Sequence, residues 1–134
     1  MKNIELINSA SQTVASGGRL NLGTVNIRTC FGAFNYNNID IITLVQPGTY
    51  QLLVKSDLTA TAAAQIVEYS VVYNGTVSSI ASATAELTAI GDAITLTVPK
   101  LIKICSEPIS LTIVNSGLAD TEYSNLIVDI VKVG

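Results

Sequence analysis

The sequence predicts an all-β protein folded as an antiparallel β-sandwich, and three observations support this prediction. Apolar and polar residues alternate with a period of two over most of the chain, as in "YQLLVKS" and "VEYSVVYNG". This is the pattern of strands that bury one face. Val, Ile and Thr, whose branched side chains suit a pleated sheet, dominate these runs. Turn sequences separate the runs at the short spacing that is typical of a sandwich or a barrel.

The alternating runs, taken in order, predict a series of strands within a single domain that spans residues 1–134. Their expected ranges are 3–8, 19–28, 31–36, 39–46, 49–57, 64–74, 76–81, 83–88, 92–98, 108–115 and 124–133. Turns are expected at "QPG" (46–48), "NG" (74–75), "GD" (91–92) and "NSG" (115–117), since these residues tolerate the backbone angles of tight turns.

Two stretches do not follow the alternation. Residues 1–18 end in "NSASQTVASGG", which is rich in small polar residues and predicts either an arm or a short edge strand with a turn. The Ala-rich "TATAAAQ" at 59–65 is the only helix candidate. Because it is short and lies between two strand patterns, we expect a loop that holds at most one helical turn.

The last run, "NLIVDIVKVG", is apolar on both faces. The inner set is Leu126, Val128 and Ile130, and the outer set is Ile127, Val131 and Val133, with Asp129 among them. A strand that is apolar on both faces is usually covered on both, whereas a two-layer sandwich covers only the inner one. We therefore expect another copy of the chain to cover the outer face. The candidate oligomer-interface residues are Tyr50, Leu53, Ile127, Val131 and Val133.

Composition supports self-association and argues against two other classes of partner. Hydrophobic residues make up 49% of the chain and charged residues only 13%, which is less charge than a monomer normally shows to water. A compact core under a Ser/Thr/Asn surface is the alternative explanation. The net charge of −3 and the scattered basic residues argue against nucleic-acid binding. No run is long enough for a membrane span, and the N-terminal residues do not form a secretion signal.

The chain lacks the residues that most enzymes use, so we expect no enzymatic activity. It contains no histidine, the commonest general base and metal ligand, and neither a Gly-x-Ser-x-Gly elbow nor a P-loop. We expect Asp57 and Asp92 to serve turns and Glu68 and Glu86 to face solvent. No catalytic, cofactor-binding or metal-binding residue is predicted. A pair of carboxylates acting as a glycosidase is the alternative.

The two cysteines, Cys30 and Cys105, are too few for a disulfide framework and do not have zinc-site spacing. In a protein made in a cytoplasm we expect both thiols to be reduced and buried, with a disulfide bridge between them as the alternative.

The order of motifs resembles one known fold. "QPGTYQLLVKSDLT", "VEYSVVYNGTVSS", "AIGDAITLTV" and "SNLIVDIVKVG" follow one another as in a TNF-like jelly roll, the fold shared by TNF cytokines and complement-type globular heads. The matching positions are Gly48, Tyr50, Asn74, Gly75, Gly91 and Asp92. The resemblance implies a jelly roll and a threefold assembly.

The flanking segments resemble a narrower group. "NSASQTVASGGRLNLGTVNIRTC" and "LIKICSEPISLTIVNSG" are similar to small bacteriophage proteins encoded near capsid genes, described as head fibres or auxiliary capsid proteins. The chain has no collagen-like stalk, which favours a capsid decoration protein over a fibre. This resemblance implies a homotrimeric virion protein, assembled in the host cytoplasm, with itself and the major capsid or other virion proteins as partners. An adhesin head that binds a receptor or a host surface glycan is the alternative, and a polysaccharide hydrolase is a weaker one.

Overall fold

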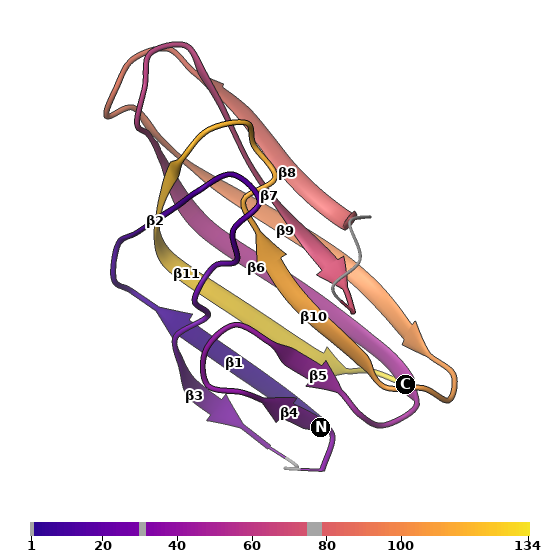
Figure 1. Cartoon of the computed structure of the whole chain (residues 1–134). Helices are drawn as coiled ribbons and strands as arrows, with labels where there is room; N and C mark the ends of the chain where they lie inside the picture. Colours follow the sequence, from indigo (N-terminus) through magenta and orange to yellow (C-terminus); the bar gives the residue numbers. More distant parts are fainter. Residues whose placement is uncertain (1, 30–31, 75–78) are drawn as a thin grey trace.

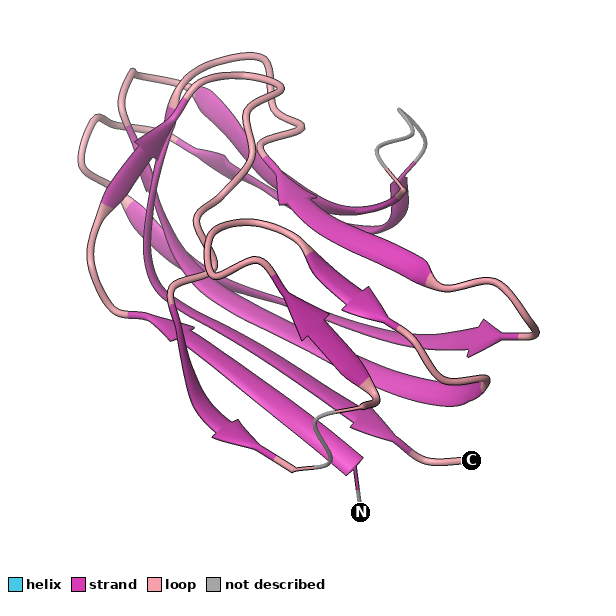
Figure 2. Ribbon diagram, turned by 60° about the horizontal axis from the view of Figure 1, so that its bottom comes forward, coloured by secondary structure: helices cyan, strands magenta, loops and turns pink. Residues whose placement is uncertain are grey.

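The structure, a computed structural model of the chain, describes residues 2–29, 32–74 and 79–134. Two antiparallel sheets pack face to face, with loops at both ends of the sandwich (Figures 1 and 2). Within the described ranges there is no helix, so the predicted all-β sandwich is confirmed. No described segment is a helix of the length and hydrophobicity needed to span a membrane.

The first sheet contains both terminal strands. Its members are β1 (Lys2–Asn8), β2 (Gln12–Val14), β3 (Thr24–Arg28), β6 (Gly48–Ala60), β9 (Ala93–Ile104) and β11 (Thr121–Lys132). They are ordered β3-β1-β11-β6-β9, and β2 pairs with the beginning of β11. Because β1 and β11 are antiparallel neighbours, the two ends of the chain lie at the same end of the molecule (Figure 2).

The second sheet lies over the first. Its members are β4 (Phe34–Tyr36), β5 (Ile42–Leu44), β7 (Gln65–Tyr73), β8 (Ser79–Leu87) and β10 (Ile109–Val114), in the order β4-β5-β10-β7-β8. The inward-facing side chains of the two sheets form one hydrophobic core. Since β8 ends the second sheet and β9 ends the first, these two edge strands lie next to each other at one side of the sandwich (Figure 1).

Buried tyrosines connect the two sheets through the core. The Tyr69 hydroxyl, on β7, donates to the carbonyl oxygens of Val54 (3.1 Å) and Leu96 (2.7 Å) across the core. The Tyr123 hydroxyl, on β11, donates to the carbonyl oxygen of Glu68 (2.7 Å). Their rings pack edge to face, with centroids 6.4 Å apart. Burial raises the pKa of both phenols well above the ordinary range, so both remain hydrogen-bond donors.

The two ambiguous stretches are not helical. Within residues 8–18 the chain forms β2, which pairs with Thr121–Tyr123 of β11. In "TATAAAQ", β6 continues to Ala60 and β7 begins at Gln65, with a four-residue turn between them. The Gln65 side chain closes this turn, because its Oε1 accepts from the Thr61 backbone N–H (2.8 Å) and its Nε2 donates to the Asp120 carbonyl (2.8 Å).

Several predicted strand boundaries are wrong. The predicted 19–28 strand begins only at Thr24. The 92–98 strand was expected to end before Pro99, but β9 continues to Ile104. A proline is tolerated there because β9 is an edge strand, where a missing N–H breaks no ladder bond. The predicted 76–81 and 83–88 strands are one strand, β8, over the part that is described. Residues 75–78 of the predicted Asn74-Gly75 hairpin lie outside the described residues.

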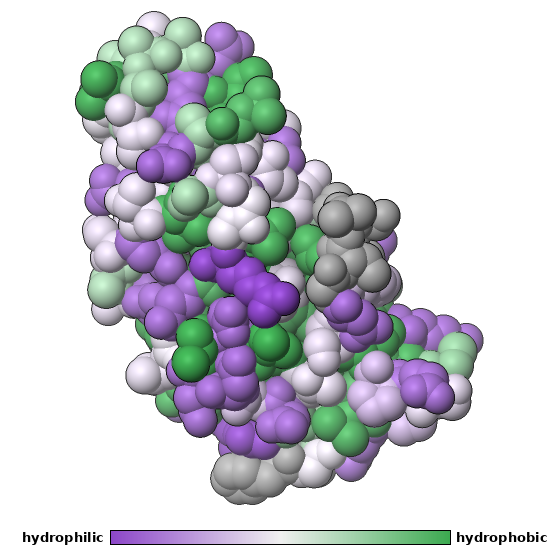
Figure 3. All heavy atoms as spheres, viewed as in Figure 1, coloured by the Kyte–Doolittle hydropathy of each residue, from purple (hydrophilic) through white to green (hydrophobic). Residues whose placement is uncertain are grey.

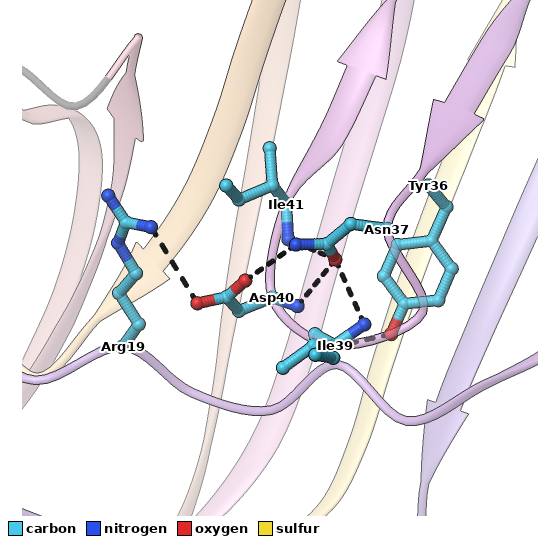
Figure 4. A network of polar contacts seen from close by, with 6 residues as sticks. All are labelled: Arg19, Tyr36, Asn37, Ile39, Asp40 and Ile41. Carbon is cyan, nitrogen blue, oxygen red and sulfur yellow. Dashed lines mark hydrogen bonds and ion pairs between the residues drawn. The ribbon is translucent and has the colours of Figure 1, made fainter.

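The predicted 39–46 strand is also shorter than expected, because a side chain holds its first residues in a turn (Figure 4). The Asn37 Oδ1 accepts from the backbone N–H groups of Ile39, Asp40 and Ile41, at 2.9–3.0 Å. The Arg19 guanidinium lies 3.7 Å from the Asp40 carboxylate. Such side chain-to-backbone bonds compete with strand pairing, so the strand begins only at Ile42.

Candidate functional site

The face of the first sheet that points away from the core is the candidate functional site. Along β11, alternate residues from Leu126 to Ile130 are buried in the core. The residues between them, Ile127, Asp129 and Val131, point outward and are partly exposed. The second apolar face that the sequence predicts for this strand is therefore present, and the described residues leave it partly exposed.

The strand register extends this face across the whole sheet. One row is Ile27, Glu5, Asp129, Leu53 and Pro99, and the next is Asn3, Val131, Gln51 and Leu101. Several apolar members are exposed: Ile27 by 47%, Leu53 by 38% and Leu101 by 64%, with Val133 beyond the end of β11 by 53%. We define the outer apolar face as Ile27, Leu53, Leu101, Ile127, Val131 and Val133. Glu5, Asp129 and Gln51 lie between these apolar residues. Exposed apolar side chains gathered on one side of a sheet are typical of an interaction site.

Four of the predicted interface residues belong to this face, and one does not. Leu53, Ile127, Val131 and Val133 point outward. Tyr50 is a correction, because its side chain is fully buried and its hydroxyl donates to the Gln46 carbonyl oxygen at 2.7 Å. Its ring packs edge to face against a core phenylalanine. A side chain that is buried within one chain has no surface to offer a second copy.

Sequence reasoning missed Ile27 and Leu101, and also Glu5, whose carboxylate lies on the same side of the sheet. Leu101 could have been found, because "PKLIKI" continues the alternation of β9 beyond Pro99. Ile27 and Glu5 could not, because only the pairing of β3 and β1 with β11 brings them to the same surface.

A pair of carboxylates lies within the outer apolar face. Glu5 and Asp129 are directly opposite each other on β1 and β11, and they share a hydrogen bond when one of them is protonated. Burial, and then the neighbouring Glu5, raise the pKa of Asp129 to about 6. Hydrogen bonds from Asp129 and from the Asn26 amide (2.7 Å) lower the pKa of Glu5. Below about pH 6 the pair therefore holds one proton, and it carries two negative charges above that.

Two other described carboxylates have structural roles. Asp57 was expected at a turn but lies within β6, where its two oxygens accept from the Thr95 hydroxyl (2.5 Å) and the Asn125 amide (2.9 Å). These bonds lower its pKa. Asp92 lies in the β8–β9 turn, as expected, and accepts from the Ala89 N–H (3.0 Å). Among the described residues no three metal-ligating side chains gather in one place.

The β8–β9 edge is a second incompletely covered apolar surface. Its inward-facing side chains are only partly buried: Ala81, Ala83, Ala85, Ile94 and Leu96. These side chains pack against the core and are still partly exposed at this side of the sandwich. We call this surface the β8–β9 edge.

The outer side of the second sheet has a different character. Figure 3 views the molecule from this side, and polar and apolar residues are mixed on it. Two hollows of about 430 and 460 Å³ lie on either side of the 116–118 loop. Arg19 and Thr112 line the first, and Ile66 lines the second. Leu118 borders both and is 98% exposed.

Cys105 lies in the connection between β9 and β10 and carries a free, exposed thiol. The expectation that it is buried is wrong, because the residue follows the last residue of β9 and is no longer part of the sheet. Cys30 lies outside the described residues, so its state stays a prediction.

No model of a known protein family matches the sequence, and no curated protein matches it either. Solved structures do match. The Eiger TNF of S. frugiperda superposes with a TM-score of 0.80 at 7% identity, covering 98% of this chain and 92% of that one. The chain has a TNF-like jelly-roll fold. The predicted fold class is thereby confirmed.

Two further structures agree with this assignment. The globular domain of zebrafish complement 1qA matches with a TM-score of 0.70 at 5% identity, covering 100% of this chain and 98% of that one. Murine APRIL matches with a TM-score of 0.73 at 12% identity, covering 98% of each chain. Identities this low relate the folds of these proteins and leave their functions open.

Proposed function

We propose that this TNF-like chain is a non-enzymatic structural protein of a virion, and that it acts as a homotrimer on the capsid as a decoration, auxiliary or head-fibre protein. The observation that carries the proposal is the outer apolar face. Its leucine, isoleucine and valine side chains lie on the outer side of four strands, β3, β11, β6 and β9. The TNF-like resemblance supports three copies.

The β8–β9 edge is the surface that suits the outer apolar face. A contact between two different surfaces of the same chain repeats from copy to copy and closes into a ring when the rotation allows. Strand addition at β9 is disfavoured, because an edge proline and the charged Lys100 and Lys103 protect it. We infer that side chains, rather than backbone hydrogen bonds, make the contact between copies.

The virion role is supported by the phage-like flanking segments. Within the described residues these segments include β2, β3, the end of β9 and all of β10, so the resemblance involves strands of both sheets. A structural role also suits the carboxylates, which are held by each other or by local amides and hydroxyls. Assembly in the host cytoplasm and residence in the particle follow from the same proposal.

Light scattering tests the assembly. The purified chain at micromolar concentration is expected to have about three times the 14.1 kDa mass of one copy. Val131→Asp places a charge on the outer apolar face, and it is expected to give a folded monomer by circular dichroism. A wild-type monomer at that concentration would contradict the proposal.

The capsid role needs its own test. Purified particles from a host culture that produces the virus are expected to contain the chain, and their mass spectrum should give a copy number divisible by three. Recovery of the chain only from the soluble fraction of the lysate would argue against a virion protein, even if the trimer forms.

An adhesin head is the second candidate, and the 116–118 loop favours it. Leu118 is almost fully exposed and borders two hollows, and recognition residues are often carried by loops on a rigid scaffold. Binding of the trimer to a glycan array, lost in Leu118→Ser, would favour this function. A polysaccharide hydrolase has less support, because Glu5 and Asp129 are hydrogen-bonded to each other and leave no space for a sugar between them.

A further inference from the structure

The Glu5–Asp129 pair lies where association through the outer apolar face would bury it. Asp129 has Ile127 and Val131 as its outward-facing neighbours along β11, and Leu53 beside it on β6. Glu5 has Ile27 beside it on β3. A partner that covers these apolar side chains also removes the two carboxylates from water.

No lysine or arginine of the described residues neutralises the pair within the chain. On the outer side of the sheet, Lys55 lies in the next row, beside Ile127, where it lowers the pKa of Asp57. Lys103 lies farther away on β9, opposite Thr49. The remaining cations near these strands are bonded elsewhere: Arg28 donates to the Phe34 carbonyl, Lys2 to the Gln46 side chain and Lys132 to the Gly134 carbonyl.

From this placement we infer that the Glu5–Asp129 pair makes assembly through the outer apolar face acid-dependent, with copies associating more tightly when the pair holds a proton. The inference rests on the proposed assembly. It makes assembly depend on pH, which the apolar contacts alone would not do.

The direction follows from desolvation. Two adjacent negative charges are costly in an apolar contact, whereas a protonated pair carries one charge and satisfies it with an internal hydrogen bond. Asp129 in the single chain already has a pKa of about 6, because of burial and then of Glu5. Covering the face raises this pKa further, so association takes up a proton from the buffer. Association is therefore strengthened as the pH falls through this range and weakened as it rises.

Analytical ultracentrifugation of a dilution series tests the inference. Between about pH 8 and about pH 5, at constant ionic strength, the chain concentration at half-assembly is expected to fall at least about tenfold, since each bound proton changes the association constant by up to about tenfold per pH unit. If the wild-type assembly remains intact at nanomolar concentration, the urea concentration that dissociates it replaces the dilution midpoint and is expected to rise on acidification.

Two variants separate the pair from general effects of acid. Asp129→Asn removes the titrating group but keeps its size and hydrogen bonding, so its assembly is expected to be as tight at about pH 8 as at about pH 5. Asp57→Asn removes a carboxylate of the same sheet that contacts a hydroxyl and an amide. This matched control is expected to keep the wild-type pH dependence.

The outcomes distinguish the dependence of assembly on pH, which we call the switch, from the assembly itself. A wild-type trimer with the same midpoint at every pH would overturn the switch and leave the proposed assembly intact. Weaker assembly in acid would also overturn the switch, since it would indicate that a lysine of the neighbouring copy pairs with the ionised carboxylates. A monomer at every pH and concentration would overturn both.

Discussion

At the scale of single residues, the buried tyrosines of this core each carry a hydroxyl group that needs a hydrogen-bond partner. Tyr36, Tyr50, Tyr69 and Tyr123 are all buried, and each donates a hydrogen bond to a backbone carbonyl. A buried phenol without a partner would be costly. The position of each of these side chains in the core is therefore fixed by hydrogen bonding as well as by packing.

The cross-core bonds of Tyr69 give a prediction at this scale. Tyr69→Phe removes the hydroxyl that donates to the Val54 and Leu96 carbonyl oxygens from the opposite sheet. The free energy of unfolding is expected to fall by about 1–2 kcal/mol, the usual cost of a lost buried hydrogen bond. Urea unfolding at a fixed chain concentration measures it. Tyr73→Phe deletes the same hydroxyl from a partly exposed side chain on the same strand, and a loss as large as that of Tyr69→Phe would contradict this explanation.

Tyr50 is the residue at which the sequence prediction of the interface was wrong. The alternation in β6 correctly separates Tyr50 from Leu53, since they are three positions apart and point to opposite faces. Tyr50 was nevertheless expected at the interface together with Leu53. The pattern gives two faces but does not say which faces the core when both carry large apolar groups. The Gln46 carbonyl that receives the Tyr50 hydroxyl becomes visible only in the fold.

At the scale of elements, β11 contributes side chains both to the core and to the outer apolar face. Substitutions on its two sides should therefore have different effects on folding and on assembly. Val128 is 1% exposed, and Val128→Asp buries an unpaired carboxylate. This is expected to cost on the order of 3–5 kcal/mol and to leave the chain largely unfolded. Val131→Asp is expected to leave the fold intact and to prevent assembly. Circular dichroism and light scattering of both variants measure this, and an assembled Val131→Asp protein would show that the outer face is not the interface.

The sequence predicted which segments form strands better than it predicted where those strands begin and end. Periodicity of two located the central parts of β1, β6, β7, β10 and β11, because these strands bury one face against the core. The ends depend on contacts that the local sequence does not contain. Gln65 closes a turn that looked like a helix candidate, and Asn37 delays the start of β5. Pro99 is tolerated only because β9 has no neighbour on its other side.

At the scale of the whole molecule, the sequence predicted the two-layer architecture but not the order of its strands. The order matters for the site, since Glu5 and Asp129 come from opposite ends of the chain and meet only because β1 pairs with β11. A shift of that register by one residue would exchange the inner and outer faces of β1. The burial of Ile4 and Leu6 in the core fixes the register and thereby places Glu5 on the outer face.

In the whole molecule, unfolding of the chain is expected to be coupled to dissociation of the trimer. When a trimer dissociates as it unfolds, each tenfold rise in chain concentration stabilises each chain by about 0.9 kcal/mol through mass action. For a chain of this length that corresponds to a rise in Tm of roughly 3 °C. We expect this dependence for the wild type in differential scanning calorimetry. Val131→Asp, in which a charge blocks the outer apolar face, should have a lower Tm that is independent of concentration. A wild-type Tm that does not change with concentration would show that unfolding is not coupled to dissociation, and that burial of the outer apolar face does not stabilise the folded chain.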